Sequence, residues 1–471
     1  MSCFSKQNVY LVFGTGITGV ATLKFLKKNN LTFFITDDNE EKLKNLKIDG
    51  NIVDESDKLY DYSSSILKEK KITHLILSPS VHAQSNPHKV VIYARELGIE
   101  IIPDVDLFYE YLQNFNFLNK TDKKIVAITG TNGKSTTTVL TAFLFNKLGY
   151  SAIACGNIGI NVLSVDVEKY DIFVVEMSSY NLFLLKYAKF TSGVLLNISE
   201  DHIEYHGTME NYASAKMKIC EISKNKIVCI DDSYTNKLAG VNDENDITKI
   251  STISRLGEGF CWQENKFYFN NELVFNGDFE NLPGKHNIEN VLCSVACVVE
   301  TLGTKDKEGI EKIFGFVKSF SNLPHRIQFI REKDGIIFIN DSKGTNANST
   351  QKALQAFKND NIYLIAGGQR KTEGFLAIQN DLKNVKCVFL IGDAMDSFAD
   401  ELDLLGIQYY KCCDMRNAVQ CAFEFARKAL LFNEKDKAKS IVLLSPLCAS
   451  WDQYLNFEHR GDDFIVNVNK L

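Results

Sequence analysis

The sequence predicts an α/β protein of three domains built on parallel sheets, with ligands held at the carboxyl ends of the strands. Two glycine-rich turns carry this prediction, because each lies between an apolar strand pattern and a helical pattern. Polar segments after several later strand patterns support it, since α/β sheets place their ligands there. The 471 residues exceed what one hydrophobic core holds. We expect domains at residues 1–120, 121–320 and 321–471.

The first glycine-rich turn, Gly14–Gly19, follows a predicted strand at Val9–Phe13 and opens a helix that runs through Leu26. A second strand, at Leu31–Thr36, ends at Asp37. This pattern meets the dinucleotide fingerprint and alone predicts a nicotinamide or flavin dehydrogenase. Glycines let the backbone approach any diphosphate, however, so another nucleotide could use the same turn. A turn needed for close helix–strand packing alone also stays open.

The second glycine-rich turn follows a β-branched run at Lys124–Thr129 and is the most informative stretch of the chain. Backbone N–H groups and a helix N-terminus at such a turn hold a phosphate, and Lys134 adds a positive charge. Either the Ser135 or the Thr136 hydroxyl could reach Mg²⁺. Two residues separate Gly130 from Gly133, whereas the usual P-loop has four, which excludes a routine kinase or GTPase. A turn without a ligand is the alternative.

Two later strand ends in this region carry candidate metal ligands. Glu176 ends a predicted strand at Asp171–Glu176, and its carboxylate suits a Mg²⁺ shared with Ser135. A carboxylate that stabilises a helix N-terminus is the alternative. His202 follows two acids after a predicted strand at Gly193–Ile198, and it is either a ligand or structural.

Lys216 lies on a predicted helix at Met209–Cys220, on a largely apolar face. It either extends its amine to solvent, which the sequence favours, or is desolvated with a lowered pKa. A desolvated amine could react with CO₂ to give a carbamate with metal-binding oxygens. The neighbours on that face are Tyr212, Ala213, Ile219 and Cys220.

The third domain places polar segments after three predicted strands. The segments are Asp341–Asn346, Gly367–Lys371 and Ser445–Ser450. Three polar strand ends in one sheet imply a cleft for a small charged molecule, although a solvated loop would explain any one of them. The strands are predicted at Ile336–Asn340, Ile362–Ala366, Cys387–Ile391 and Ile441–Leu444.

The composition excludes several functional classes. A net charge of −6 gives no support for nucleic-acid binding. The 12 cysteines form no C-x-x-C pair, which favours reduced thiols over disulfides or a zinc ribbon. No apolar run approaches the ~20 residues that span a bilayer, and the first residues lack a signal-peptide pattern. We expect a cytoplasmic protein with no nucleic acid and no stable membrane association.

Together these motifs resemble the Mur ligases along the whole chain. The block Asp-Ser-Lys-Gly-Thr-Asn at Asp341–Asn346 discriminates, because it indicates the D-glutamate-adding type rather than ligases that add lysine or meso-diaminopimelate. Another Mur-type ligase or a folate polyglutamating enzyme is the same-fold alternative. A dinucleotide-dependent oxidoreductase and a non-catalytic nucleotide-binding module are the others. Further carrying motifs are Gly156–Gly159, Glu176–Ser179, Glu200–His202, Gly284–Asn290, Leu323–Arg326 and Ser445–Gly461.

The resemblance implies a function and a fold for each domain. ATP would phosphorylate the carboxylate of UDP-N-acetylmuramoyl-L-alanine to an acyl phosphate, and D-glutamate would attack it, in cytoplasmic peptidoglycan precursor synthesis. The first domain is then a Rossmann-like unit that holds UDP rather than NAD. The second is a P-loop-type ATPase domain, and the third is a Rossmann-like domain that binds the amino acid. The resemblance further implies two Mg²⁺ ions and a monomer.

The resemblance also assigns residues to each ligand. Catalytic roles fall to Lys134, His202, Lys216 and Lys343. ATP contacts fall to Gly130, Thr131, Asn132, Gly133, Lys134, Ser135, Thr136, Asn287, Asn290, Arg326 and Asp341. The UDP-substrate takes Ile17, Thr18, Asp37 and Asn157, and D-glutamate takes Lys343, Thr345, Lys371, Ser450 and Phe457. The two Mg²⁺ ions take Ser135 with Glu176, and His202 with carbamylated Lys216.

Four positions depart from the family pattern. Ser80 and Pro103 stand where glycine is usual, and Asn181 stands where glutamine is usual. Gln369 and Arg370 precede Lys371 in a loop that usually carries an acid, which weakens the alignment of Lys371. None of these positions lies in the second glycine-rich turn, residues 129–136, which we call the phosphate loop, or among the residues assigned to the metal ions.

Overall fold

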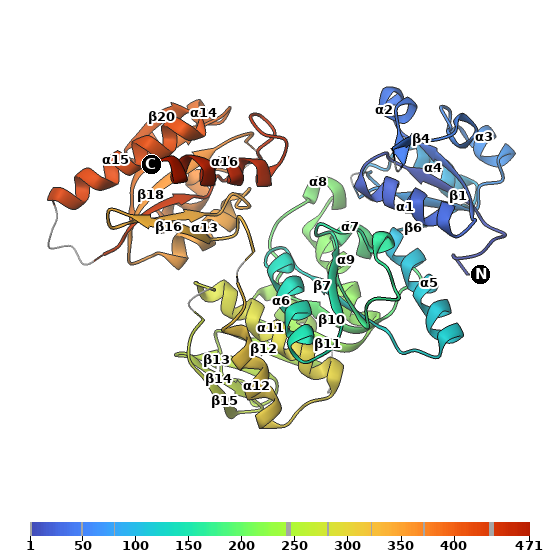
Figure 1. The fold of residues 1–471 in the computed structure, drawn as a ribbon, viewed down its shortest axis with the longest axis horizontal. Coiled ribbons are helices and arrows are strands. Elements are labelled where there is room, and N and C mark those ends of the chain that lie inside the picture. The colour runs from blue at the N-terminus through green and yellow to red at the C-terminus, as the bar shows by residue number, and fades with distance from the viewer. Residues whose placement is uncertain are drawn as a thin grey trace. The chain divides into compact units, whose positions relative to one another are not determined.

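The chain forms two compact units in a computed structural model (Figure 1). The first comprises Met1–Asp278 with Glu289–Ser319, and the second comprises Phe279–Ile288 with Phe320–Leu471. The first unit contains two large sheets and the second contains one. The three-domain division at residues 1–120, 121–320 and 321–471 stays a prediction. The structure describes residues 2–48, 50–79, 81–241, 246–279, 282–321, 323–370, 373–432 and 438–471.

The N-terminal sheet has the strand order β2-β1-β5-β6, and its four strands are parallel. Gly19 has to be glycine for close packing, because a Cβ atom there would lie 1.8 Å from the Gly14 carbonyl oxygen. The packing interpretation of this turn therefore explains part of the pattern. The elements are β1 Val9–Phe13, α1 Ile17–Lys28, β2 Thr32–Thr36, α2 Glu40–Lys44, β3 Lys47–Ile48, β4 Asn51–Ile52, α3 Ser64–Glu69, β5 His74–Leu77, α4 Lys89–Glu96, β6 Glu100–Ile102 and α5 Asp104–Asn119.

The central sheet has the order β15-β14-β13-β12-β11-β10-β7-β9-β8 and becomes antiparallel at β13. Strand β7, which leads into the phosphate loop, lies between β10 and β9, so their polar ends flank that loop. The elements are β7 Lys124–Thr129, α6 Lys134–Lys147, β8 Ala152–Gly156, β9 Ile172–Glu176, α7 Ser179–Leu184, β10 Phe190–Leu195, α8 Ile203–His206, α9 Met209–Glu221, β11 Ser223–Cys229, α10 Ser233–Val241, β12 Ile247–Ser251, β13 Phe260–Gln263, β14 Lys266–Phe269, β15 Glu272–Asn276, α11 Lys285–Leu302 and α12 Lys307–Val317.

One strand prediction in this sheet needs correction. The strand predicted at Gly193–Ile198 is β10, which starts earlier and ends at Leu195. Asn197 leaves the ladder because its side-chain oxygen accepts a hydrogen bond from the Asn132 backbone N–H at 2.9 Å. The polar end of β10 thus serves the phosphate loop instead of extending the sheet.

The C-terminal sheet has the order β16-β17-β21-β18-β19-β20, and β16 pairs antiparallel with β17. The three strands that precede the predicted polar segments, β17, β21 and β18, are direct neighbours. Their carboxyl ends therefore lie side by side, and the cleft itself stays a prediction. The elements are β16 Gln328–Lys333, β17 Ile336–Asn340, α13 Ala347–Ala356, β18 Asn361–Gly367, β19 Val385–Ile391, α14 Met395–Leu405, β20 Tyr409–Cys413, α15 Met415–Phe432, β21 Ser440–Leu444 and α16 Phe457–Lys470.

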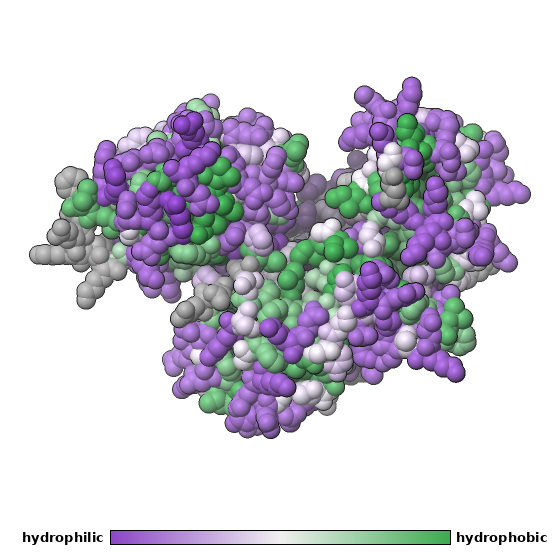
Figure 2. All heavy atoms as spheres, viewed as in Figure 1, coloured by the Kyte–Doolittle hydropathy of each residue, from purple (hydrophilic) through white to green (hydrophobic). Residues whose placement is uncertain are grey.

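The outer surface is mixed in character. On the face drawn in Figure 2, hydrophilic residues predominate and smaller apolar areas lie between them. Within the described part of the chain, no helix combines the length and apolar character that crossing a membrane requires.

Candidate active site

The phosphate loop joins β7 to α6 and is clamped by the end of β10. The Thr131 backbone N–H donates to the Asn197 carbonyl oxygen at 2.8 Å, and the Thr131 hydroxyl donates to the Ser199 carbonyl oxygen at 3.1 Å. Gly133 caps α6 with φ +85°, a left-handed conformation that glycine adopts without strain. The loop is therefore fixed against the end of β10 and leads directly into the N-terminus of α6, where an anion can be held.

Lys134 points into its own loop. Its Nζ donates to the carbonyl oxygens of Gly130 at 2.9 Å and Thr131 at 2.8 Å. These are contacts of a cation held beside the cradle, from which the flexible side chain can move to a phosphate.

Lys216 of α9 contacts the same loop. Its Nζ donates to the Gly130 carbonyl oxygen at 2.7 Å, and the residue is 2% exposed. Burial lowers the pKa of Lys216 far below its usual value, and the nearby Lys134 ammonium lowers it further. The amine is therefore desolvated. The sequence had favoured an amine that extends to solvent, and that prediction is wrong.

Glu176, at the end of β9, provides the observation that bears on a metal ion. The residue is 4% exposed, and its Oε2 is buried without a hydrogen-bond partner. A buried carboxylate oxygen without a partner is costly unless a cation binds it. Among the described residues, no cluster of three or more ligating side chains occurs. Mg²⁺ fits such a site, because it commonly takes one or two carboxylates and completes its shell with phosphates and water.

His202 occupies a strained position before α8, with φ +54°. Its Nδ1 lies 2.7 Å from the Tyr180 hydroxyl, and its Nε2 lies 3.4 Å from an Asp201 carboxylate oxygen. Burial lowers the pKa of His202 despite the nearby carboxylates of Asp201 and Glu204, so the neutral ring is favoured. Metal binding by His202 would have to displace one of these two partners, and this assignment stays a prediction.

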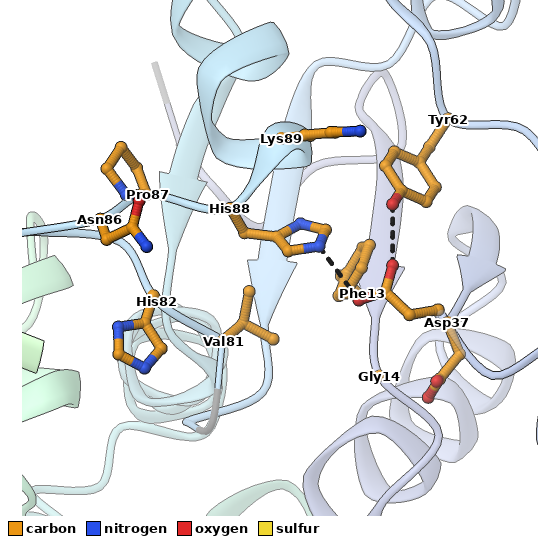
Figure 3. Close-up of a pocket in the computed structure, with 11 residues that line it drawn as sticks. Phe13, Gly14, Asp37, Tyr62, Val81, His82, Asn86, Pro87, His88 and Lys89 are labelled. Carbon is orange, nitrogen blue, oxygen red and sulfur yellow. Dashed lines mark hydrogen bonds and ion pairs between the residues drawn. The ribbon is translucent and has the colours of Figure 1, made fainter.

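A pocket of about 670 Å³ opens at the carboxyl end of β1. Both His88 and Tyr62, which Figure 3 draws at this pocket, contact the carboxylate of Asp38. The distances are 3.0 Å from His88 Nε2 and 2.7 Å from the Tyr62 hydroxyl. The ring of Phe13 packs against both, with centroid distances of 5.3 Å to Tyr62 and 4.9 Å to His88. The pocket combines aromatic faces with carboxylates, which suits a nucleobase and its ring N–H groups.

The predicted UDP-substrate residues have different places around this pocket. Asp37 lines it, and its Oδ2 accepts from both the backbone N–H and the hydroxyl of Thr15. Burial would raise the pKa of Asp37, but hydrogen bonds from Asn39 and Thr15 lower it, so the carboxylate is charged. Ile17 is 80% exposed on α1, and the pocket lining does not include Ile17, Thr18 or Asn157.

In the second unit, Arg460 of α16 ties the three polar strand ends together. Its guanidinium is fully buried and donates to the carbonyl oxygens of Ser342, Cys448 and Gly367 at 2.9, 3.1 and 3.4 Å. Burial lowers the pKa of Arg460 to about 10, which keeps it cationic at neutral pH. Sequence reasoning missed this residue. The available signal was its spacing of four and eight residues from Phe464 and Val468, which places it on the buried face of the helix.

The predicted D-glutamate residues come together in part. The Lys343 ammonium lies 3.9 Å from the ring centroid of Phe457. Ser450 is buried, and Thr345 is half-buried next to Lys343 in the same segment. Lys371 lies outside the described residues.

The four remaining ATP assignments divide between the two units. Asn290 in the first unit accepts from the Thr137 hydroxyl at 3.2 Å and lies against Gly133. Asn287, Arg326 and Asp341 belong to the second unit. Burial raises the pKa of Asp341 to about 7, against the opposing hydrogen bond from Ser445.

Comparison with known proteins identifies the family. Residues 128–298 match the Mur ligase middle domain, and residues 325–444 match the Mur ligase, glutamate ligase domain. The UDP-N-acetylmuramoylalanine--D-glutamate ligase of Caldicellulosiruptor bescii is 36% identical, over 99% of this chain and 98% of that protein. A protein of the same name from Agrobacterium fabrum is 34% identical, over 100% and 97%. This chain belongs to the Mur ligase family.

Solved structures agree on the fold of this Mur ligase. The UDP-N-acetylmuramate-alanine ligase MurC of Thermotoga maritima superimposes with a TM-score of 0.57 at 17% identity, covering 98% of this chain and 99% of that one. The MurF ligase of the same organism gives a TM-score of 0.56 at 19% identity, covering 86% and 92%. The predicted α/β fold class is confirmed.

Two of the departures from the family pattern have local explanations in this Mur ligase. Asn181 Nδ2 donates to Asp104 at 3.2 Å, and Asn181 Oδ1 accepts from the Ser178 hydroxyl at 2.6 Å. The shorter side chain is thus used within the fold. Pro103 caps the start of α5, where a fixed φ is tolerated. Ser80 lies outside the described residues.

Proposed function

We propose that this Mur ligase joins D-glutamate to UDP-N-acetylmuramoyl-L-alanine with hydrolysis of ATP to ADP and phosphate. The observation that carries the proposal is the similarity to UDP-N-acetylmuramoylalanine--D-glutamate ligases along the entire chain, since eight relatives of 32–36% identity share that name. The activity belongs to peptidoglycan precursor synthesis and to the cytoplasm. A monomer remains our expectation.

The chemistry requires charge neutralisation more than covalent catalysis. The alanyl carboxylate attacks the γ-phosphorus of ATP, the bond to the β-phosphate oxygen breaks, and an acyl phosphate forms with ADP. The neutral amine of D-glutamate attacks the acyl carbon, and the tetrahedral intermediate expels phosphate and loses a proton. Lys134 stabilises the transferring phosphoryl group, because its ammonium already lies at the loop that would hold the phosphates.

ATP-dependent Mur ligases use Mg²⁺, and Glu176 supports one site here. Its buried Oε2 lacks a partner, and Ser135 lies in the first turn of α6, the helix that follows the phosphate loop. When bound, Mg²⁺ would supply positive charge that offsets the charge of the phosphate groups. We assign Ser135 and Glu176 to one ion, and His202 and Lys216 to the other.

We further propose that Lys216 is carbamylated. The neutral amine adds to CO₂ and releases one proton, which gives an N-carboxylate with two oxygens that can bind metal. The buried environment that favours a neutral amine supports this reaction. Protein equilibrated with ¹³CO₂ should show a carbamate carbon resonance that Lys216→Met lacks, and identical spectra would reject the modification.

We assign the aromatic and acidic pocket beside β1 to the uridine of the UDP-substrate, with Asp37 at its edge. Ile17, Thr18 and Asn157 would contact the remaining parts of that substrate. In the second unit, we assign D-glutamate to Lys343, Thr345, Lys371, Ser450 and Phe457. A lysine ammonium over an aromatic ring suits one carboxylate of the amino acid.

The test measures phosphate release from ATP with UDP-N-acetylmuramoyl-L-alanine and one amino acid at a time. D-Glutamate should support turnover that depends on all three substrates. Turnover with L-lysine or meso-diaminopimelate, but not with D-glutamate, would assign the chain to another Mur ligase activity. Oxidation of NAD(P)H with no phosphate release would favour the oxidoreductase alternative.

A further inference from the structure

One imidazole in the first unit, that of His206, joins the N-terminal pocket to the phosphate-transfer site. The residue lies at the end of α8 and is fully buried. Its Nδ1 lies 2.6 Å from Gln84 Oε1, and its Nε2 lies 2.9 Å from the Ser179 hydroxyl. The two hydrogen bonds join residues that are 122 and 27 positions apart in the sequence.

The directions of the two hydrogen bonds follow from the donor inventory. The carbonyl oxygen of Gln84 can only accept, so Nδ1 of the imidazole carries the proton. In the neutral ring, Nε2 then accepts from the Ser179 hydroxyl. Burial lowers the pKa of His206 to about 4, which agrees with a neutral ring. The Ser179 oxygen keeps its lone pairs and can accept from a substrate N–H.

Each end of this chain of hydrogen bonds lies at a place of functional interest. Gln84 belongs to the loop 81–88, and residues of that loop, including His82 and His88, line the pocket (Figure 3). Ser179 begins α7, three residues after Glu176 at the end of β9. A movement of the pocket loop would therefore change the orientation of a hydroxyl that lies three residues along the chain from the proposed metal ligand Glu176.

The aromatic rings around His206 extend the connection. Tyr180 stacks on it at 5.8 Å and touches His202 through its hydroxyl. Tyr212 packs against it at 5.4 Å and lies 3.0 Å, hydroxyl to hydroxyl, from Thr131 of the phosphate loop. The imidazole therefore contacts the pocket loop, α7 and α9 directly, and it is linked to the phosphate loop through Tyr212.

We propose that Gln84, His206 and Ser179 form a positioning relay that couples occupancy of the UDP-substrate pocket to the orientation of the Ser179 hydroxyl at the phosphate-transfer site. This inference rests on the proposed function. His206 is a positioning residue, because it acts through Ser179 and touches no reacting atom. The relay makes the UDP-linked substrate, rather than ATP or D-glutamate, the ligand whose binding it senses.

The test is a double-mutant cycle between two residues that His206 separates. Gln84→Leu and Ser179→Ala should each lower kcat/KM for the UDP-linked substrate by roughly tenfold, as expected for one lost hydrogen bond. If His206 connects them, the double variant should lose about tenfold as well, rather than the roughly hundredfold product expected of independent sites. The loss should appear in KM for the UDP-linked substrate, with KM for ATP unchanged. A multiplicative double variant overturns the relay.

Two further variants separate positioning from structure. Ser85→Ala is the matched control, because Ser85 lies on the same loop and its hydroxyl donates to the Glu204 carbonyl oxygen of α8 at 2.8 Å, away from the imidazole. It should keep wild-type KM values, and a loss equal to that of Gln84→Leu would mean that any loosening of the loop suffices. His206→Gln can keep one of the two bonds and should fall between wild type and His206→Phe.

Wild-type turnover is measured first, so that the two proposals fail separately. Absence of D-glutamate-dependent phosphate release in the wild type overturns the proposed function. An active wild type with a multiplicative cycle overturns the relay alone. Melting temperatures of all variants should stay near that of the wild type, and the cycle is read from variants that meet this condition.

Discussion

Replacing Gly133 with alanine should destabilise the phosphate loop by an amount that the structure lets us calculate. Gly133 has φ +85°, and a Cβ atom there would lie 2.2 Å from Asn290 Oδ1 and 3.4 Å from a methyl carbon of Leu196. Asn290 cannot swing away freely, because it is 3% exposed and accepts a hydrogen bond from Thr137. The substitution therefore adds a steric conflict to the backbone strain.

Gly149 provides the matched control at the other end of the same helix. It has φ +94°, and a Cβ atom there would meet nothing within 4 Å. Alanine in a left-handed conformation costs about 1–2 kcal/mol. The smaller entropy of the unfolded chain offsets about 0.4–1 kcal/mol of that cost. We expect Gly149→Ala to lower the free energy of unfolding by about 1 kcal/mol.

Gly133→Ala should cost about 3–5 kcal/mol, because displacing Asn290 adds overpacking of about 1–3 kcal/mol and the loss of a hydrogen bond of about 1 kcal/mol to the same backbone cost. Chemical denaturation of both variants measures the difference directly, and calorimetry with ATP measures the consequence. Gly133→Ala should lose nucleotide affinity, whereas Gly149→Ala should keep it. Equal destabilisation of the two variants would refute the steric argument, and wild-type ATP affinity in Gly133→Ala would refute the assignment of the loop.

Three further predictions concern single groups in the site. Lys134→Ala should abolish phosphate release and keep the wild-type melting temperature, since its amine contacts loop carbonyls rather than the core; near wild-type turnover would contradict the phosphate-loop assignment. Lys216→Ala should lose most activity and regain part of it with acetate, because acetate can occupy the place of the carbamate. Lys216→Arg should be inactive with or without acetate. Full activity of the alanine variant in CO₂-depleted buffer would show that the second metal has another ligand. The pKa of Asp341 is raised from 3.8 to about 7, so between these pH values the folded protein binds more protons than the unfolded chain. The free energy of unfolding, compared with that of Asp341→Asn, should therefore fall as the pH rises from about 4 to about 7 and then level off. Parallel pH profiles of the two proteins in chemical denaturation would reject the raised pKa.

The sequence predicted well those features that lie within one strand and the turn after it. The bounds predicted for β1 and β17 are the observed ones, since an apolar run followed by a polar residue marks a strand end locally. The phosphate loop could be predicted from the sequence for the same reason. The lateral order of strands is not a local property, so the adjacency of β17, β21 and β18 needed the structure.

Residues whose role depends on a partner far away in sequence were missed or left open. Gln84 and His206 carry no pattern that distinguishes them from ordinary polar residues, because their hydrogen bond joins positions 122 residues apart. The apolar face around Lys216 was visible, but a lysine on such a face can extend to solvent or stay buried. The burial of the side chain decides between these outcomes, and that burial depends on the packing of α9 against the sheet.

The Gly130 carbonyl oxygen shows why the two lysines have to be considered together. It accepts from Lys134 at 2.9 Å and from Lys216 at 2.7 Å, so two charged ammonium groups would lie close together and repel each other. The more buried lysine loses less by releasing its proton, because desolvation already disfavours its charge. The charge of Lys134 therefore helps to keep Lys216 neutral. A neutral Lys216 is the form that can add to CO₂, so the cation that we propose for phosphate transfer would also favour the carbamate that we propose for the second metal site.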